Sequence, residues 1–463
     1  MRETASKLRY IQRVPAWGRL DGACAMKVKN TVEPQRDTLG ISGLLHSVIN
    51  AGRDILARRR KATTDSPSSD LIDKCKQLLH HRGEASGLAL ACEVIDEYRV
   101  LDEPNKLAFF EALSEQFSVD ANAVIAAAQQ YQTSTSREHL SELSKAIEAP
   151  RLKLFRRMNM APDATPTLVR MRGEVLRFCK THPHLKDVES DLKQLFISWF
   201  NRGFLQLSVI DWQSPAAVLE RIIRYESVHA IEGWDDLRSR LSDNRMCFAF
   251  FHPTMPDDPL VFVEVAITAG TPAAIAPIIE KTNEPYDVSE LDTAVFYSIS
   301  NCHPGLAGVS FGNFLIKQVV KEVGKRFPLI RRFITLSPVP GFAKWLTAEQ
   351  GDAAVEELRM LAASEGRETH DRRWESAVAM CAHYLVNERR NNLAADPVAR
   401  FHLGNGASLH AINWAADLSE RGLAQSAGIM VNYLYDLDSI EENHDAYFDE
   451  GRVARSKNVN RLL

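Results

Sequence analysis

Two patterns of hydrophobic and polar positions follow each other along the chain. In residues 69–202 apolar residues recur with a helical period, as at Leu192, Leu195, Phe196 and Trp199, which fall at positions i, i+3, i+4 and i+7 on one helix face. Glycine is almost absent from this region, and β-branched residues form few clusters. We therefore predict an all-helical bundle domain here, with the size and patterning to build an oligomer interface.

A different pattern begins after residue 203, where short apolar runs alternate with turns and amphipathic segments. The runs predicted to form strands are 247–251, 260–267, 294–300, 333–336 and a stretch near 427–434. The segments predicted to form helices are about 313–327, 352–364 and 370–388. Strands and helices mixed in this order predict an α/β domain with a mixed central sheet over residues 203–463.

The first 68 residues carry few signals of order. A basic run at Arg58–Lys61 precedes a polar segment rich in serine and threonine, so we predict a flexible N-terminal segment over residues 1–68. The first 30 residues are rich in arginine and lysine and poor in acids. That composition fits a transit peptide, and a later start at Met26 fits it equally.

A glycine-rich turn, Gly305–Gly312, separates one predicted strand from the helix predicted to begin at Asn313. Glycines let backbone N–H groups approach an anion closely, and a helix N-terminus favours negative charge. The spacing matches neither a Walker loop nor a dinucleotide fingerprint, whereas folds that transfer acyl groups from coenzyme A use a similar loop between two splayed strands. The turn is therefore a candidate cradle for a pyrophosphate, with a tight strand-to-helix turn as the alternative.

Several segments resemble the malonyl-CoA decarboxylase family. The long ones are Gly305–Asn313, Thr335–Leu346 and Pro397–Ala407, and the shorter ones are Phe204–Leu205, Trp212–Pro215, Ile412–Asp417 and Asn432–Tyr433. The resemblance extends over roughly residues 70–450. It implies an acetyltransferase-like (GNAT-type) catalytic domain, conversion of malonyl-CoA to acetyl-CoA and carbon dioxide, and a homo-oligomer, most simply a tetramer.

The reaction that this resemblance implies sets simple chemical demands. Loss of carbon dioxide from a 3-carboxy thioester needs stabilisation of the developing enolate oxygen and a proton donor for the α-carbon. The thioester carbonyl itself takes up the electrons, so we expect no metal and no cofactor.

The family resemblance implies that Ser337 and His402 are the catalytic residues. Pro338 holds Ser337 in an extended conformation at a strand end, although a serine that only caps a turn is the alternative. Histidine transfers protons near neutral pH, although a histidine among apolar neighbours is often structural. We expect Ser337 to bind the carboxylate and His402 to protonate the α-carbon; alternatively the two act as a coupled pair in both steps.

The resemblance also maps substrate binding onto the glycine-rich turn. The substrate-binding residues it implies are Ala307, Gly308, Val309, Ser310, Phe311, Gly312 and Asn313, with Ser337 and His402 at the acyl group. An acidic residue occurs in the family where this chain has Ser310, so we assign that side chain no role. Lys317 and Lys321, one turn apart on the next helix, either meet phosphate charge or form a solvated face.

Four further residues are candidates for a supporting role. Asn405 and Asn432 are candidate donors to the thioester carbonyl, and Tyr433 is either near the site or simply packed in the core. Glu264, in an apolar strand, is either a proton relay or a paired structural carboxylate.

Composition and charge argue against nucleic acid and membranes as partners. Hydrophobic residues make up 45% and charged residues 25% of the chain, as in ordinary globular proteins. A net charge of -4 provides no attraction to nucleic acid or an anionic membrane, and no window approaches the roughly 18 apolar residues of a membrane span. The seven cysteines are scattered without metal-binding spacing, which favours a reducing cytoplasm; Cys302, beside the turn, is expected to be structural.

Two rival functions stay open. An acyl-CoA-dependent N-acyltransferase would use the same fold with an amine acceptor. A non-catalytic acyl-CoA sensor would bind coenzyme A without turnover, but such a sensor does not require both Ser337 and His402.

Overall fold

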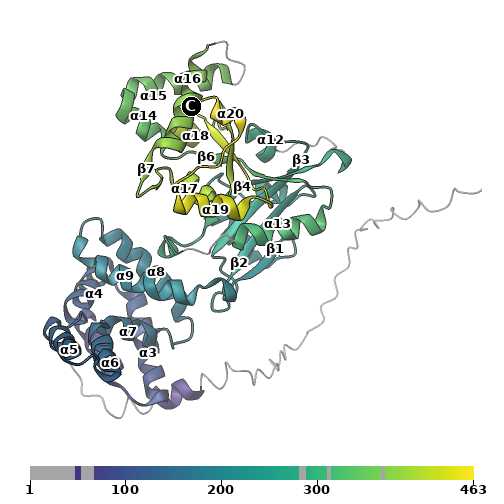
Figure 1. Ribbon diagram of the computed structural model, residues 1–463. Helices are drawn as coiled ribbons and strands as arrows, with labels where there is room; N and C mark the ends of the chain where they lie inside the picture. Colours follow the sequence, from purple (N-terminus) through teal and green to yellow (C-terminus); the bar gives the residue numbers. More distant parts are fainter. Residues whose placement is uncertain (1–46, 54–66, 281–287, 310–313, 367–370) are drawn as a thin grey trace, which may run out of the picture. The chain divides into compact units, whose positions relative to one another are not determined.

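The computed structural model describes residues 47–53, 67–280, 288–309, 314–366 and 371–463 (Figure 1). The prediction for residues 1–68 falls mostly outside these ranges, as do those for Ser310, Phe311, Gly312 and Asn313.

Helices make up the described part of the N-terminal region, as predicted. They are α2 (Pro67–His80), α3 (Glu84–Val100), α4 (Glu103–Gln116), α5 (Ala121–Thr133), α6 (Arg137–Ile147), α7 (Pro150–Met158), α8 (Ala164–Phe178), the short η1 (Pro183–Leu185) and α9 (Lys186–Trp199). Asp102, Asp120 and Ser136 begin α4, α5 and α6 by accepting backbone N–H bonds. Leu192 and Phe196, on the predicted face of α9, are completely buried.

An eight-stranded sheet forms the second region. Its strands are β1 (Gln206–Ile210), β2 (Arg245–Phe251), β3 (Val261–Thr268), β4 (Thr293–Asn301), β5 (Arg332–Thr335), β6 (Ser337–Pro338), β9 (Ser408–Asn413) and β10 (Met430–Leu434). Their order is β1-β2-β3-β4-β5-β10-β6, with β9 beside β10. Only the pairing of β4 with β5 is parallel among the described strands. The predicted mixed sheet, and with it the predicted fold class, is confirmed.

Helices cover the sheet and extend beyond β6 (Figure 1). They are η2 (Arg202–Phe204), α10 (Ala216–Tyr225), α11 (Trp234–Arg240), α12 (Ala276–Ile279), η3 (Val288–Glu290), η4 (Pro304–Leu306), α13 (Phe314–Arg326), α14 (Phe342–Gln350), α15 (Asp352–Glu365), α16 (Arg373–Asn387), α17 (Pro397–Gly404), α18 (Glu420–Ser426), α19 (Ile440–Asp449) and α20 (Lys457–Asn460). A separate hairpin pairs β7 (Arg389–Arg390) with β8 (Leu393–Ala394). The three helices predicted for this region correspond to α13, α15 and α16.

Strands β4 and β5 part at one end. They pair as far as Phe296 and Thr335, and the last bond between them runs from the Leu336 N–H to the Phe296 carbonyl at 3.0 Å. β4 then continues to Asn301. The segment after β5 turns away from β4, so that Ser337 pairs with β10. The result is the splayed strand pair typical of acetyltransferase-like folds.

The splay places Thr335 and Ser337 on one face of the sheet. Ile334 and Leu336 belong to a core cluster with Tyr297 of β4. Successive side chains along an extended strand point to opposite faces. Thr335 and Ser337 therefore project to the face away from that cluster.

Candidate active site

Ser337 and His402, predicted from the sequence to act together, are in direct contact. The Ser337 Oγ lies 3.0 Å from the His402 Nε2, although the two residues are 65 positions apart in the chain. Both are buried, with exposed fractions of 5% for Ser337 and 3% for His402. The pairing brings the first residue of β6 against the last turn of α17.

A buried carboxylate ties these two elements together. Asp396 begins α17 by accepting the N–H groups of Val398 and Ala399, each at 2.9 Å, and Pro397 occupies the first helical position, where its missing N–H costs nothing. The second oxygen of Asp396 accepts the Gly341 N–H at 3.1 Å. One side chain therefore fixes both the start of the His402 helix and the turn that follows Ser337.

The hydrogen bonds around Ser337 and His402 form a chain in which each hydroxyl or ring N–H donates to the next group. The Tyr435 hydroxyl lies 2.8 Å from the His402 Nδ1 and has no other partner among the described residues. A phenol that donates to Nδ1 leaves the ring proton on Nε2, facing Ser337. The Ser337 hydroxyl then donates to the Thr335 Oγ1 at 2.9 Å. This chain runs from Tyr435 through His402 and Ser337 to Thr335.

His402 is neutral in the free protein. Its ring stacks on that of Tyr433, with centroids 4.7 Å apart and planes 23° apart. Burial without a carboxylate partner lowers the pKa of His402 to about 3. Protonation of the ring therefore requires a negative charge to be brought beside it.

Asn432 and Tyr433 support the pair, whereas the Asn405 side chain is hydrogen-bonded elsewhere. Asn432 donates to the Thr335 carbonyl at 2.8 Å, and the Tyr433 N–H donates to the Thr335 Oγ1 at 3.1 Å. Both hold the end of β5 in place. The Asn405 side-chain amide donates to the Phe401 carbonyl of its own helix at 2.8 Å, and only its backbone N–H bonds to His402, at the carbonyl oxygen 3.1 Å away.

Glu264 lies in a separate cluster. Its carboxylate is completely buried and lies 3.1 Å from the Arg240 Nη1. Burial, reinforced by Glu226 and opposed by Arg240, raises the pKa of Glu264 to about 8. This arrangement agrees with a paired structural carboxylate and gives no contact with Ser337 or His402.

Of the glycine-rich turn, the structure describes residues up to Val309. Gly308 has a φ of 70°, a left-handed conformation that favours glycine. The remaining predicted phosphate-binding residues lie outside the described ranges. The turn follows β4, and α13 begins just beyond it.

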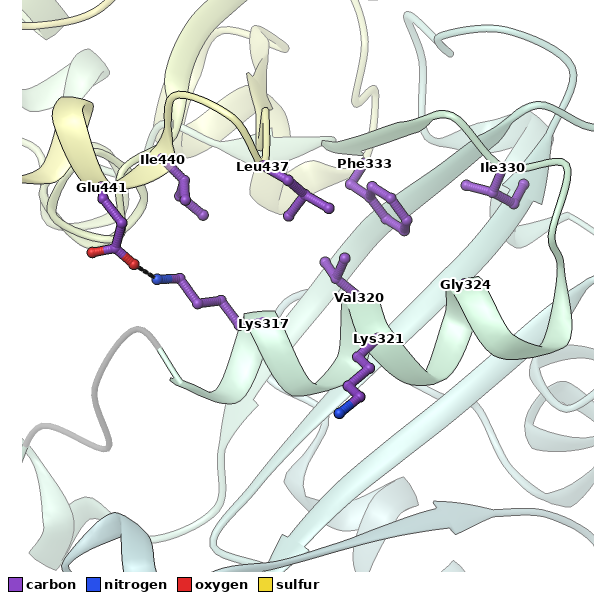
Figure 2. A pocket seen from close by; sticks show the side chains of 9 residues that line it. All are labelled: Lys317, Val320, Lys321, Gly324, Ile330, Phe333, Leu437, Ile440 and Glu441. Atoms are coloured by element: carbon purple, nitrogen blue, oxygen red, sulfur yellow. Dashed lines mark hydrogen bonds and ion pairs between the residues drawn. The ribbon is translucent and has the colours of Figure 1, made fainter.

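The two lysines of α13 border an apolar groove of about 560 Å³ between α13, β5 and α19 (Figure 2). Lys317 forms an ion pair with Glu441 at the groove's edge. Figure 2 shows Lys321 pointing away from the apolar lining side chains. The ion pair of Lys317 and the outward direction of Lys321 favour the solvated-face interpretation of this helix.

Sequence reasoning missed three contributors to the site. Thr335 and Tyr435 hydrogen-bond to the predicted pair, and Asp396 joins their elements. Asp396 carried a readable signal, because an aspartate followed by proline is typical of a helix start. Nothing in the local pattern around Tyr435 indicates that its hydroxyl reaches a histidine on another helix.

The described residues contain no group of three or more side chains that could hold a metal ion. Cys302 is 5% exposed, and burial raises the pKa of its thiol. None of the helices in the described ranges has the length and apolarity needed to cross a membrane.

Comparison with known proteins identifies the family. Residues 203–463 match the family described as malonyl-CoA decarboxylase C-terminal domain, and residues 117–200 match the corresponding N-terminal domain. Mitochondrial malonyl-CoA decarboxylase of Anser anser anser is 36% identical over 341 residues, which are 66% of this chain and 68% of that protein. The Rattus norvegicus protein is 35% identical over 67% of this chain and 70% of its own length.

Solved structures agree with these sequence matches. The crystal structure of malonyl-CoA decarboxylase from Rhodopseudomonas palustris has a TM-score of 0.81 and 47% identity, covering 86% of this chain and all (100%) of that one. The Agrobacterium vitis protein has a TM-score of 0.79 and 44% identity over 85% of this chain and 99% of that chain. The fold, the paired Ser337 and His402 and these matches together show that the chain belongs to the malonyl-CoA decarboxylase family.

Proposed function

We propose that this chain is a carboxy-lyase that converts malonyl-CoA to acetyl-CoA and carbon dioxide. The observation that carries the proposal is the buried hydrogen bond between Ser337 and His402 beside the splay of β4 and β5. The family membership supports the choice of substrate. The chemistry needs only hydrogen-bond donors and one proton, which these side chains supply.

Substrate binding changes the state of His402. When the malonyl carboxylate approaches Ser337, its negative charge favours the imidazolium and raises the pKa of His402 from its low value in the free protein. The ring then takes up one proton from solvent. The Ser337 hydroxyl turns from Thr335 toward the carboxylate and orients it for loss.

Proton transfer completes the reaction. Breaking the bond between the α-carbon and the carboxylate releases carbon dioxide and leaves an enolate. The α-carbon takes the Ser337 hydroxyl proton, and Ser337 regains a proton from the His402 Nε2, 3.0 Å away. The reaction consumes one proton in total, which is the one that His402 took up. The 3.0 Å bond favours this coupled action over direct transfer from His402.

The test is the mass of the product formed from malonyl-CoA by the wild type, Ser337→Ala and His402→Asn. Acetyl-CoA should form with the wild type and fall by orders of magnitude in both variants, while coenzyme A still binds. His80→Asn, an exposed histidine of the helical region, is the matched control and should retain activity.

Other outcomes would redirect the assignment. Coenzyme A binding by folded wild type without any acetyl-CoA would favour the sensor. Acyl transfer to an added amine, in place of carbon dioxide release, would favour the N-acyltransferase. Either result would remove the decarboxylase proposal.

We also propose that residues 69–202 form an oligomerisation domain of a homotetramer. Ile125, Leu140 and Ile147 of α5 and α6 are 55%, 46% and 55% exposed, and α6 has no buried residue. Exposed large apolar side chains on two helices that pack against each other are suited to a surface that another chain covers. Light scattering should give the mass of four chains, and Leu140→Glu combined with Ile147→Glu should lower it. Ser141→Glu, an exposed position on another face of the same helix, is the control. A single-chain mass for the wild type would contradict the proposal.

The six described cysteines are all free, which supports our proposal of a reducing, cytoplasmic location.

A further inference from the structure

The helical region makes direct contact with Gly305, the first residue of the glycine-rich turn. A Cβ built on Gly305 would lie 1.8 Å from the Val169 carbonyl oxygen of α8, and one built on Gly173 would lie 3.4 Å from the Gly305 nitrogen. At Gly305 only glycine fits such an approach of two backbones. The turn is therefore seated on α8.

Arg172 fixes the turn from the same helix. It is 1% exposed and donates to the Gly305 carbonyl at 2.6 Å and the Ala307 carbonyl at 2.9 Å. Its guanidinium also bonds to Glu189 of α9. The charge of Arg172 is thus paired inside the protein, and its remaining donors hold the backbone of the turn.

The two hydrogen bonds from Arg172 also orient the N–H of Gly308. In a trans peptide the N–H points opposite to the C=O, so the Gly308 N–H faces away from the guanidinium that holds the Ala307 carbonyl. In the part of the chain that the structure describes, no acceptor is found for the Gly308 N–H. A polar group left this way at the predicted phosphate site is suited to an anionic ligand.

A lysine of the helical region lies beside the same residue. A Cβ built on Gly308 would lie 3.3 Å from the Lys193 Nζ of α9. The acids flanking Lys193 on α9, Glu189 and Asp191, are already paired with Arg172 and Arg151. Lys193 itself forms no ion pair with any described residue.

We propose that Lys193 is a ligand of the coenzyme A phosphates, so that the helical region completes the substrate site in cis, with Arg172 as the residue that positions the turn. The inference rests on the proposed function, since it names how that site binds its substrate. An ammonium beside a free backbone N–H offers two donors to one phosphate, and charge-assisted bonds of this kind are about twice as strong as neutral ones. The acyl end, held at Ser337 and His402, does not involve Lys193.

The test separates phosphate binding from chemistry. Lys193→Met keeps the aliphatic stem and removes the charge, Lys193→Arg keeps the charge, and Lys186→Met removes a lysine two turns away on the same helix. The KM for malonyl-CoA should rise about tenfold in Lys193→Met, the size expected for one charge-assisted bond, with kcat unchanged. Lys193→Arg and Lys186→Met should stay near the wild type.

Malonyl-pantetheine, which lacks the diphosphate and the adenosine phosphate, is the second substrate. Its KM should be the same in wild type and Lys193→Met. An unchanged KM for malonyl-CoA in Lys193→Met, or an equal rise for both substrates, would overturn the inference. Arg172 is not substituted, because its loss would leave Glu189 unpaired and endanger folding.

Calorimetric titration with coenzyme A separates this inference from the proposed reaction. An affinity about tenfold weaker in Lys193→Met supports the phosphate role even if the wild type does not decarboxylate malonyl-CoA. Equal affinities of wild type and Lys193→Met overturn it even if decarboxylation is found. A wild type that does not bind coenzyme A would overturn both.

Discussion

Two buried polar clusters lie on either side of the splay between β4 and β5, and they hold charge differently. The serine–histidine cluster consists of Thr335, Ser337, His402 and Tyr435, and the glutamate cluster of Glu226, Arg240, Glu264 and Ser298. The first is neutral in the free protein, because burial lowers the pKa of His402 to about 3. The second contains charged and titratable groups whose partners are all within the protein.

The difference lies in which hydrogen bonds can be exchanged. Glu226 accepts the N–H groups of Val228 and His229 in addition to serine hydroxyls. Loss of these partners would leave a buried charge uncompensated. Ser337, by contrast, can turn its hydroxyl from Thr335 to a substrate, because the Thr335 Oγ1 keeps the Tyr433 N–H at 3.1 Å. Exchangeable neutral bonds suit chemistry, and fixed charged ones suit stability.

The largest expected effect separates the two clusters by activity. His402→Asn should lower kcat by a factor of about 10²–10⁴, the usual contribution of a general acid. Glu264→Gln, a matched change of one buried side chain in the glutamate cluster, should leave kcat close to the wild-type value. Single-turnover decarboxylation measures both. A comparable loss in Glu264→Gln would assign the glutamate cluster to the chemistry and break the comparison.

The next effect concerns the dependence of stability on pH. The carboxyl of Glu264 has an ordinary pKa of 4.5, and the folded protein raises this pKa to about 8. The folded state therefore binds the proton more tightly. Protonated Glu264 therefore stabilises the folded protein. This stabilisation is fully present below about pH 4.5 and is lost as the pH rises through about 8.

Glu264→Gln should remove this slope, which amounts to at most about 1.4 kcal/mol per pH unit. Urea unfolding of wild type and variant across this pH window gives the two free energies of unfolding. Parallel profiles would show that Glu264 keeps an ordinary pKa through its pairing with Arg240.

The third prediction tests the direction of bonds in the serine–histidine cluster. Tyr435→Phe removes the donor to Nδ1, so the ring proton is free to move to Nδ1, and the Nε2–H that faces Ser337 is lost. One hydrogen bond of this kind is worth about tenfold to a hundredfold in rate. The expected result is a lower kcat with unchanged affinity for coenzyme A. A wild-type kcat would mean that the tautomer is set without Tyr435.

Local signals in the sequence predicted the fold class, whereas the family resemblance implied the pair of Ser337 and His402, which the structure places in contact. Strands such as β3 are long apolar runs, and α13 has a clear helical period. The strands that these signals missed are short or partly exposed, as in β6 and β1. Two residues of β6 cannot carry a period, and the pairing with β10 alone makes them a strand.

The rest of the site depends on contacts that local pattern does not encode. Tyr435 reaches His402 from a position 33 residues away, and Lys193 reaches Gly308 from another region of the chain. For Glu264 the sequence left two interpretations open, a proton relay and a paired structural carboxylate. Its Arg240 partner on α11 becomes apparent only in the folded chain.

The smallest expected effect comes from a change at Asp396, a buried carboxylate next to the serine–histidine cluster. Like Glu226, Asp396 accepts backbone N–H groups of its own protein. Burial raises the pKa of Asp396, while three backbone N–H groups oppose this shift. Asp396→Ala should cost about 1–2 kcal/mol of stability as a lost helix cap and should also lower kcat. Asp102→Ala, which removes the exposed cap of α4, should cost stability alone.

Comparing Asp396→Ala with Asp102→Ala separates the positioning of Ser337 and His402 from the stability of a helix cap. Asp396 also binds the Gly341 N–H beyond Ser337, a bond for which Asp102 has no counterpart near a reacting group. Asp396→Asn keeps an acceptor oxygen for α17 and should recover part of the activity. Equal kcat values for Asp396→Ala and Asp102→Ala at matched stability would show that the Ser337–His402 distance is maintained without this clamp. The fixed bonds around the site would then serve stability alone, as they do in the glutamate cluster.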